Sequence, residues 1–88
     1  MAAERGDAEA LKRLGDIYEK ENALEAVKWY KMAVEQGNAS ASFYLGLIYE
    51  YGKPGIPKNK AEAIKWYRKA AEQGSETAQK NLRKLENE

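Results

Sequence analysis

The chain of 88 residues contains no cysteine and no histidine. Without cysteine it can form neither a disulfide nor a cysteine-based zinc or iron–sulfur site, and it carries no thiol nucleophile. Without histidine it lacks the commonest metal ligand and the commonest general base. We therefore expect no metal, no cofactor and no catalytic residues, and we predict that the protein is not an enzyme.

An excess of charge of one sign is also missing, because 15 lysines and arginines balance 14 acidic residues. This balance argues against a strongly basic nucleic-acid-binding protein. No apolar run reaches the roughly 18 residues that would suggest a membrane span. The N-terminal residues lack the apolar stretch of a signal peptide. We expect neither nucleic acids nor membranes as partners, and a cytoplasmic location.

An internal repeat is the main feature that is present. Residues 22–37 align with residues 59–74 at a constant offset of 37, and most aligned positions are identical or similar. A second set recurs at an offset of 31, in which Ala10, Leu14, Gly15, Ile17 and Tyr18 correspond to Ala41, Leu45, Gly46, Ile48 and Tyr49. These offsets predict one domain over 1–88, with repeat one at 6–36, repeat two at 37–73 and a capping helix at 74–88.

Each repeat is predicted to be a pair of helices. Gly37 and Gly74 follow the last periodic residue of a segment, where glycine favours the end of a helix. Asn22 and Asn59 each precede a glutamate by three residues, which is typical of a capping box. The predicted N-caps are Asp7, Asn22, Asn38, Asn59 and Ser75. We predict an all-α fold with helices at 7–20, 22–36, 38–51, 59–73 and 75–87.

The first helix of each copy carries an apolar stripe with the spacing i, i+4, i+7. The stripe consists of Ala10, Leu14 and Ile17 in the first copy, Ala41, Leu45 and Ile48 in the second, and Ala78, Leu82 and Leu85 in the third. A neighbouring stripe, which would face the second helix of a pair, becomes polar in the third copy at Gln79, Arg83 and Glu86. This change is expected of a helix that ends a solenoid.

Two glycines inside predicted helices need a physical reason, because glycine costs about 1 kcal/mol relative to alanine there. We expect Gly15 and Gly46 to allow close approach of the second helices through Tyr30 and Tyr67. Trp29 and Trp66 are expected to fill the seam between repeats. The loop 51–58 does not match a phosphate-binding pattern, and its Ile56 is expected to pack into the helix pair.

The repeat resembles the Sel-1-like repeat family, a branch of the tetratricopeptide-like α-solenoids. The matching residues in repeat two are Ala41, Leu45, Gly46, Tyr49, Gly52, Gly55, Ile56, Asn59, Ala63, Trp66, Tyr67, Ala70 and Gly74. Repeat one departs from the pattern, because its loop passes through 19–22 without the two glycines. The resemblance implies a right-handed superhelix of helix pairs whose first helices line a concave surface that binds proteins or peptides.

A candidate binding strip lies on the predicted helix 38–51. Phe43, Leu47 and Tyr51 share one face of that helix, outside both stripes. The surrounding charged residues of the candidate site are Lys12, Asp16, Glu50, Lys80 and Lys84. An apolar centre with a charged rim is typical of a binding surface. Packing between neighbouring helices is the other interpretation of Phe43 and Leu47, and the sequence leaves both open.

The sequence leaves open both the function and the oligomeric state. The predicted function is a non-catalytic module that binds a protein or peptide, and the alternative is an engineered structural repeat scaffold without a natural ligand. We expect mostly a monomer, with weak end-to-end self-association through Ala2, Ala3, Ala8 and Leu11.

Overall fold

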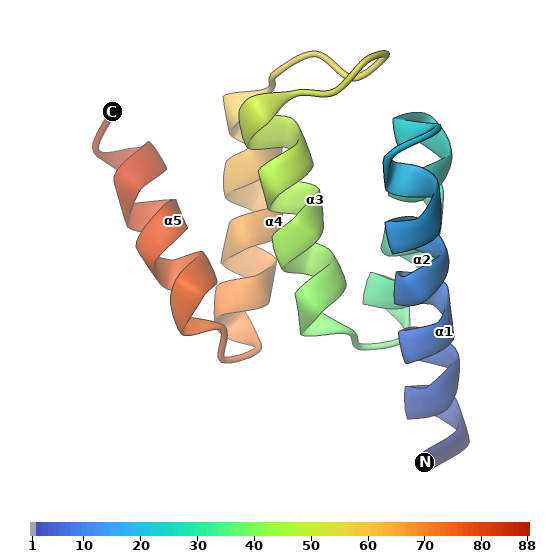
Figure 1. The fold of residues 1–88 in the computed structure, drawn as a ribbon. Helices are drawn as coiled ribbons and strands as arrows, with labels where there is room; N and C mark the ends of the chain where they lie inside the picture. Colours follow the sequence, from blue (N-terminus) through green and yellow to red (C-terminus); the bar gives the residue numbers. More distant parts are fainter. Residues whose placement is uncertain (1) are drawn as a thin grey trace.

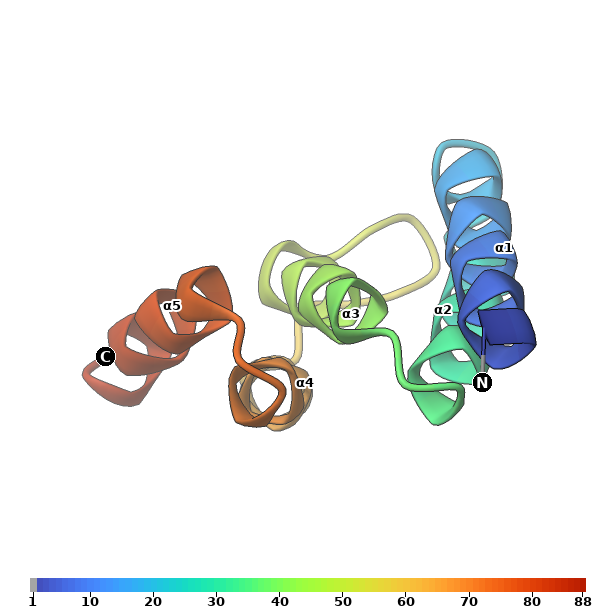
Figure 2. The same ribbon diagram turned by 90° about the horizontal axis from the view of Figure 1, so that it is seen from below.

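The computed structural model describes residues 2–88, and their side chains from Ala8 onward. These residues form five helices and no strand: α1 (Ala2–Glu19), α2 (Ala23–Glu35), α3 (Ala39–Tyr51), α4 (Lys60–Glu72) and α5 (Glu76–Glu86). Helices α1, α3 and α5 form one layer, and α2 and α4 form the other (Figures 1 and 2). The predicted all-α helical repeat fold is confirmed.

The start of the first helix was predicted wrongly. Helix α1 begins at Ala2 rather than at residue 7, so the backbone at Gly6 and Asp7 is helical and Asp7 is not an N-cap. Alanine, glutamate and arginine at residues 2–5 are strong helix formers, and they carry the helix through the one glycine. Met1 and the side chains of residues 2–7 lie outside the described residues, and so do the self-association contacts expected of Ala2 and Ala3.

Side-chain caps begin the other four helices, as predicted. Asn22, Asn38, Asn59 and Ser75 each accept a hydrogen bond from the backbone N–H three residues later, at 3.2, 3.0, 3.1 and 3.1 Å. The N–H groups of Asn22 and Asn59 donate to the carbonyls of Tyr18 and Tyr49, at 2.7 and 2.8 Å. A backbone carbonyl thus takes the bond that the glutamate of a capping box would accept.

The two helix pairs are held by the same glycine–tyrosine contact. A Cβ added to Gly15 would lie 2.5 Å from the Tyr30 ring, and one added to Gly46 would lie 2.4 Å from the Tyr67 ring. Both rings are fully buried, so they have no free space in which to move away. The predicted close approach of the helices at both glycines is confirmed.

The seam between the repeats is closed by one of the two tryptophans. Trp66 is only 7% exposed and packs in a cluster with residues of α2 and α3, among them Val27 and Leu45. Trp29, its equivalent in repeat one, stays half-buried, because no described helix pair lies on its outer side. The prediction was therefore correct for Trp66 and wrong for Trp29.

The loop between α3 and α4 fastens repeat two to repeat one. It extends toward α1 and α2 (Figure 1), and Ile56 is 5% exposed in the same cluster as Val27. Lys53 and Ile56 exchange two backbone hydrogen bonds of 2.8 Å, which close the loop. The Lys53 ammonium lies 3.6 Å from Glu19 of α1. Ile56 therefore packs as predicted.

Candidate functional site

Helix α3 supplies the three central residues of the predicted site, but their surroundings differ. Phe43 and Leu47 are half-buried and pack against the core between α4 and α5. The centres of the Phe43 and Tyr67 rings are 5.8 Å apart. Tyr51, in the last position of α3, is 60% exposed. Part of the predicted strip therefore contributes to packing, whereas Tyr51 is free to contact a partner.

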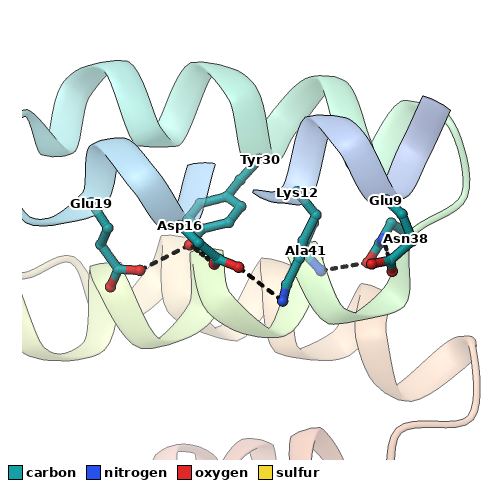
Figure 3. A network of polar contacts seen from close by, with 7 residues as sticks. All are labelled: Glu9, Lys12, Asp16, Glu19, Tyr30, Asn38 and Ala41. Atoms are coloured by element: carbon teal, nitrogen blue, oxygen red, sulfur yellow. Dashed lines mark hydrogen bonds and ion pairs between the residues drawn. The ribbon is translucent and has the colours of Figure 1, made fainter. Parts of the chain in front are cut away.

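On the α1 side, Lys12 and Asp16 form an ion pair with 3.0 Å between their charged atoms. The Lys12 ammonium also lies 4.9 Å from the centre of the Tyr44 ring, and Tyr44 stacks on Tyr30 at 5.7 Å. The hydrogen bond to Asp16 raises the pKa of Lys12 above its ordinary value. These contacts connect α1 to α3 through Tyr44 and to α2 through Tyr30, whose hydroxyl contacts Asp16 (Figure 3).

Buried tyrosine hydroxyls bind carboxylates in both repeats. The Tyr30 hydroxyl oxygen lies 2.5 Å from Asp16 and 2.8 Å from Glu19, so the two carboxylates share its one proton. Tyr67 donates to Glu50 at 2.6 Å. Burial raises the pKa of both tyrosine hydroxyls, and the hydrogen bonds to carboxylates raise it further. Asp16 and Glu50 therefore hold helix pairs together in addition to lining the predicted site.

On the α5 side, the two predicted lysines differ in their contacts. The Lys84 ammonium lies 3.9 Å from Glu50, whereas Lys80 is exposed on the same helix. A shallow depression of about 390 Å³ joins Tyr51 and Glu50 to Lys84, to Lys58 at the end of the loop and to Lys60 at the start of α4. The structure thus brings Tyr51, Glu50 and Lys84 together and leaves Lys80 outside this depression.

Glu19 and Tyr44 also lie in this region, although neither was predicted from the sequence. Glu19 and Glu50 are separated by the repeat offset of 31, and this offset could have revealed the shared tyrosine–glutamate contact. Tyr44 corresponds to Arg13 in the first copy, so no repeat signal marks it. Tyr44, Lys12 and Tyr30 lie on three different helices, and only the tertiary structure brings them together.

The described side chains of this region offer aromatic, basic and acidic groups. Among the described side chains, no group of three or more acidic residues is arranged to hold a metal ion. None of the five described helices is long and apolar enough to cross a membrane. Aromatic rings, lysines and carboxylates lie side by side along α1, α3 and α5, an arrangement that suits recognition of a polypeptide.

Known proteins are similar to this chain in sequence, and two solved structures are similar to it in fold. The rat protein named DAP3-binding cell death enhancer 1 is 42% identical over 90 residues, which cover 99% of this chain and 18% of the rat protein. A crystal structure of a protective antigen of uropathogenic Escherichia coli strains, described as displaying an SLR fold, has a TM-score of 0.81 and 45% identity. The match covers 91% of this chain and 18% of the antigen.

A Sel1 repeat protein from Oxalobacter formigenes has a TM-score of 0.72 and 43% identity, over 92% of this chain and 35% of that protein. The chain thus spans well under half the length of each of these proteins. The family model described as Sel1 repeat matches residues 8–38 and 39–75, which cover most of α1 and all of α2, α3 and α4. The sequence pattern, the five-helix fold and this match agree, and the chain belongs to the Sel1 repeat family.

Proposed function

We propose that the surface formed by α1, α3 and α5 binds a protein or peptide partner, and that the protein is a non-catalytic interaction module. We call this surface the first-helix face and define it by Lys12, Asp16, Tyr44, Phe43, Leu47, Glu50, Tyr51 and Lys84. Repeats of this family are generally protein–protein interaction modules. The rat relative is itself named for binding another protein.

One observation carries the proposal: an exposed aromatic side chain lies among charged groups of both signs. Tyr51 projects from the end of α3 with 60% of its surface accessible. The Lys84–Glu50 ion pair lies beside it, in the depression that all three residues line. Aromatic side chains at the centre of an interface contribute most of the binding energy, and charges at the rim select the partner.

The side chains of the first-helix face indicate which kind of partner it would bind. Half-buried Phe43 and Leu47 continue from Tyr51 along α3 and offer apolar surface, so the partner should present an aromatic or aliphatic anchor. Lys12–Asp16 and Lys84–Glu50 place both signs of charge along that surface. A short polypeptide with an apolar anchor and flanking residues of both charges fits this arrangement.

Selection of peptides from a random displayed library, with the whole chain as bait, tests the proposal. Tyr51→Ala should lower the affinity of the selected peptides about tenfold or more, which corresponds to the loss of a residue that contributes ~1.4 kcal/mol to binding. Leu24→Ala is the matched control, because Leu24 is 61% exposed but lies on α2 against the loop. Selected peptides that bind equally well to the Tyr51→Ala variant would contradict the proposal. Failure to select any peptide would favour the scaffold alternative.

A further inference from the structure

Three lysines gather at the end of the array where α3 ends, α4 begins and α5 ends (Figure 1). Lys58, Lys60 and Lys84 line the same depression as the exposed ring of Tyr51. We call these three residues the lysine cluster. All three side chains are exposed, so their ammonium groups are accessible to a ligand that contacts the tyrosine.

Two carboxylates line this depression as well, but they do not neutralise the cluster. Glu50 uses one oxygen for the hydroxyl of the buried tyrosine of α4, and its other oxygen lies 3.9 Å from the Lys84 ammonium. The Glu50 side chain is only 10% exposed. Glu88 is exposed, yet neither Lys58 nor Lys60 belongs to an ion pair among the described residues. The charge that the depression presents to a partner is therefore mainly positive.

The two lysines around the start of α4 belong to repeat two alone. At the start of α2 the corresponding residues are Glu21 and Ala23. Lys60 is the first residue of α4, where the positive end of the helix macrodipole makes a lysine unfavourable. The same asparagine-capped helix start forms in repeat one without lysines. Stability of the helix therefore does not explain Lys58 and Lys60, whereas binding of an acidic group does.

The depression is not the open half of a helix pair. On α3, Ser42 and Gly46 are buried, and Gly46 lies against the ring of Tyr67 of α4. The corresponding residues of α5 are Gln79 and Arg83, which are polar and exposed. A further helix would therefore find no apolar surface on that side of α5, so the cluster does not belong to an apolar seam between helices.

We infer that the lysine cluster binds acidic side chains of the partner polypeptide, next to the apolar anchor that contacts Tyr51. This inference rests on the proposed function and adds to it where the acidic residues of the partner lie. The α1 end of the first-helix face differs, because Lys12 is already paired with Asp16 at 3.0 Å. Charges at the rim of an apolar centre select the partner more than they add affinity.

Two synthetic peptides with the same central leucine test the inference on the full chain. Two glutamates flank the leucine on each side in the first peptide, and glutamines replace them in the second. Fluorescence anisotropy of the labelled peptides measures their affinities. The glutamate peptide should bind at least tenfold more tightly at about 50 mM salt, and this preference should shrink at about 500 mM salt, which screens exposed charges.

The double variant Lys58→Gln with Lys60→Gln should remove most of the preference for glutamate and leave the affinity of the glutamine peptide unchanged. The matched control is Lys31→Gln with Lys69→Gln, which removes the same charge from exposed positions of α2 and α4 and should keep the preference. All four lysines are exposed, so both double variants should retain the circular dichroism spectrum of the wild type.

The outcomes separate this inference from the proposed function. Equal affinities of the two peptides, both reduced in Tyr51→Ala, would overturn the inference and support the proposed function. A preference for glutamate that survives Lys58→Gln with Lys60→Gln would also overturn the inference, because the acidic residues would then bind elsewhere. An affinity of the glutamate peptide that Tyr51→Ala leaves unchanged would contradict both. If neither peptide binds, the inference is wrong, and the library selection alone decides the proposed function.

Discussion

The two repeats build the same kind of helix pair, but the exchange of Asp16 for Leu47 changes what this position does. In repeat one, Asp16 and Glu19 share the one hydroxyl proton of Tyr30. In repeat two, Glu50 alone accepts from Tyr67, and Leu47 replaces the aspartate. Leu47 packs against the core between α4 and α5. One repeat therefore strengthens the pair with polar contacts, whereas the other uses the same position to join the next helix.

A second difference between the repeats comes from neighbours rather than from sequence. Trp66 and the α3 stripe are buried because repeat one lies beside them. Trp29 and the α1 stripe have the same sequence pattern and remain partly open. In a repeat array, the burial of a residue is set by what stacks on its repeat as much as by the residue itself.

The largest effect is expected from the two tryptophans. Trp66→Ala should lower the free energy of unfolding by about 3–5 kcal/mol, since it removes a buried ring from the seam. Trp29→Ala should cost clearly less, because its ring is already partly in water. Urea unfolding of both variants measures the difference. Equal losses would mean that burial by the neighbouring repeat does not distinguish the two positions.

The glycine–tyrosine contacts come next, and here the repeats should behave alike. Gly15→Ala and Gly46→Ala should each cost about 1–3 kcal/mol, the usual effect of overpacking a core. Gly37→Ala provides a control with a different cause: its added Cβ meets open space, but its φ is +94°. That variant should cost about 1–2 kcal/mol through backbone strain alone. A small loss of stability in Gly15→Ala with a large one in Gly46→Ala would show that the α1–α2 pair accommodates the added methyl group more easily.

The periodicity of the sequence predicted the fold, because helix caps, stripes and glycines are local signals that repeat at fixed offsets. It failed at the start of α1, where Gly6 and Asp7 look like a boundary but stand within a run of strong helix formers. For the site, the sequence left open whether Phe43 packs or binds and gave no sign of Tyr44. Both depend on which neighbouring helix lies closer to α3, and no local signal encodes that distance.

The site residues on α3 should separate packing from binding. Phe43→Ala should lower the free energy of unfolding by about 1–3 kcal/mol, because its ring is half-buried against the α4–α5 core. Tyr51→Ala should change it by no more than about 0.5 kcal/mol, the range for exposed positions. Thermal unfolding of both variants measures this. A Phe43→Ala variant as stable as the wild type would mean that Phe43 does not stabilise the α4–α5 core and contributes to the first-helix face alone.

The smallest effects concern the tyrosine hydroxyls. Tyr30→Phe removes a hydroxyl whose one proton two carboxylates share, whereas Tyr67→Phe removes one that meets a single carboxylate, so Tyr30→Phe should be the more destabilising. A typical net value is about 1 kcal/mol per hydrogen bond, and carboxylates left near solvent recover part of it from water. Urea unfolding at neutral pH compares the two variants. A larger loss of unfolding free energy in Tyr67→Phe than in Tyr30→Phe would contradict this expectation.

The same hydroxyls give the two variants a distinct pH dependence. In the unfolded chain a tyrosine loses its proton near pH 10, whereas burial and the neighbouring carboxylates hold the pKa of Tyr30 and Tyr67 well above that value in the folded chain. Above pH 10 the unfolded state therefore binds fewer protons than the folded state, and stability falls as the pH rises. The contribution is complete below about pH 10 and is lost progressively above it. Urea unfolding at pH 9 and about pH 11 should show a smaller loss in each phenylalanine variant than in the wild type, and the smallest loss in the double variant. Identical losses in all four proteins would mean that other groups, such as the lysines, cause the alkaline instability.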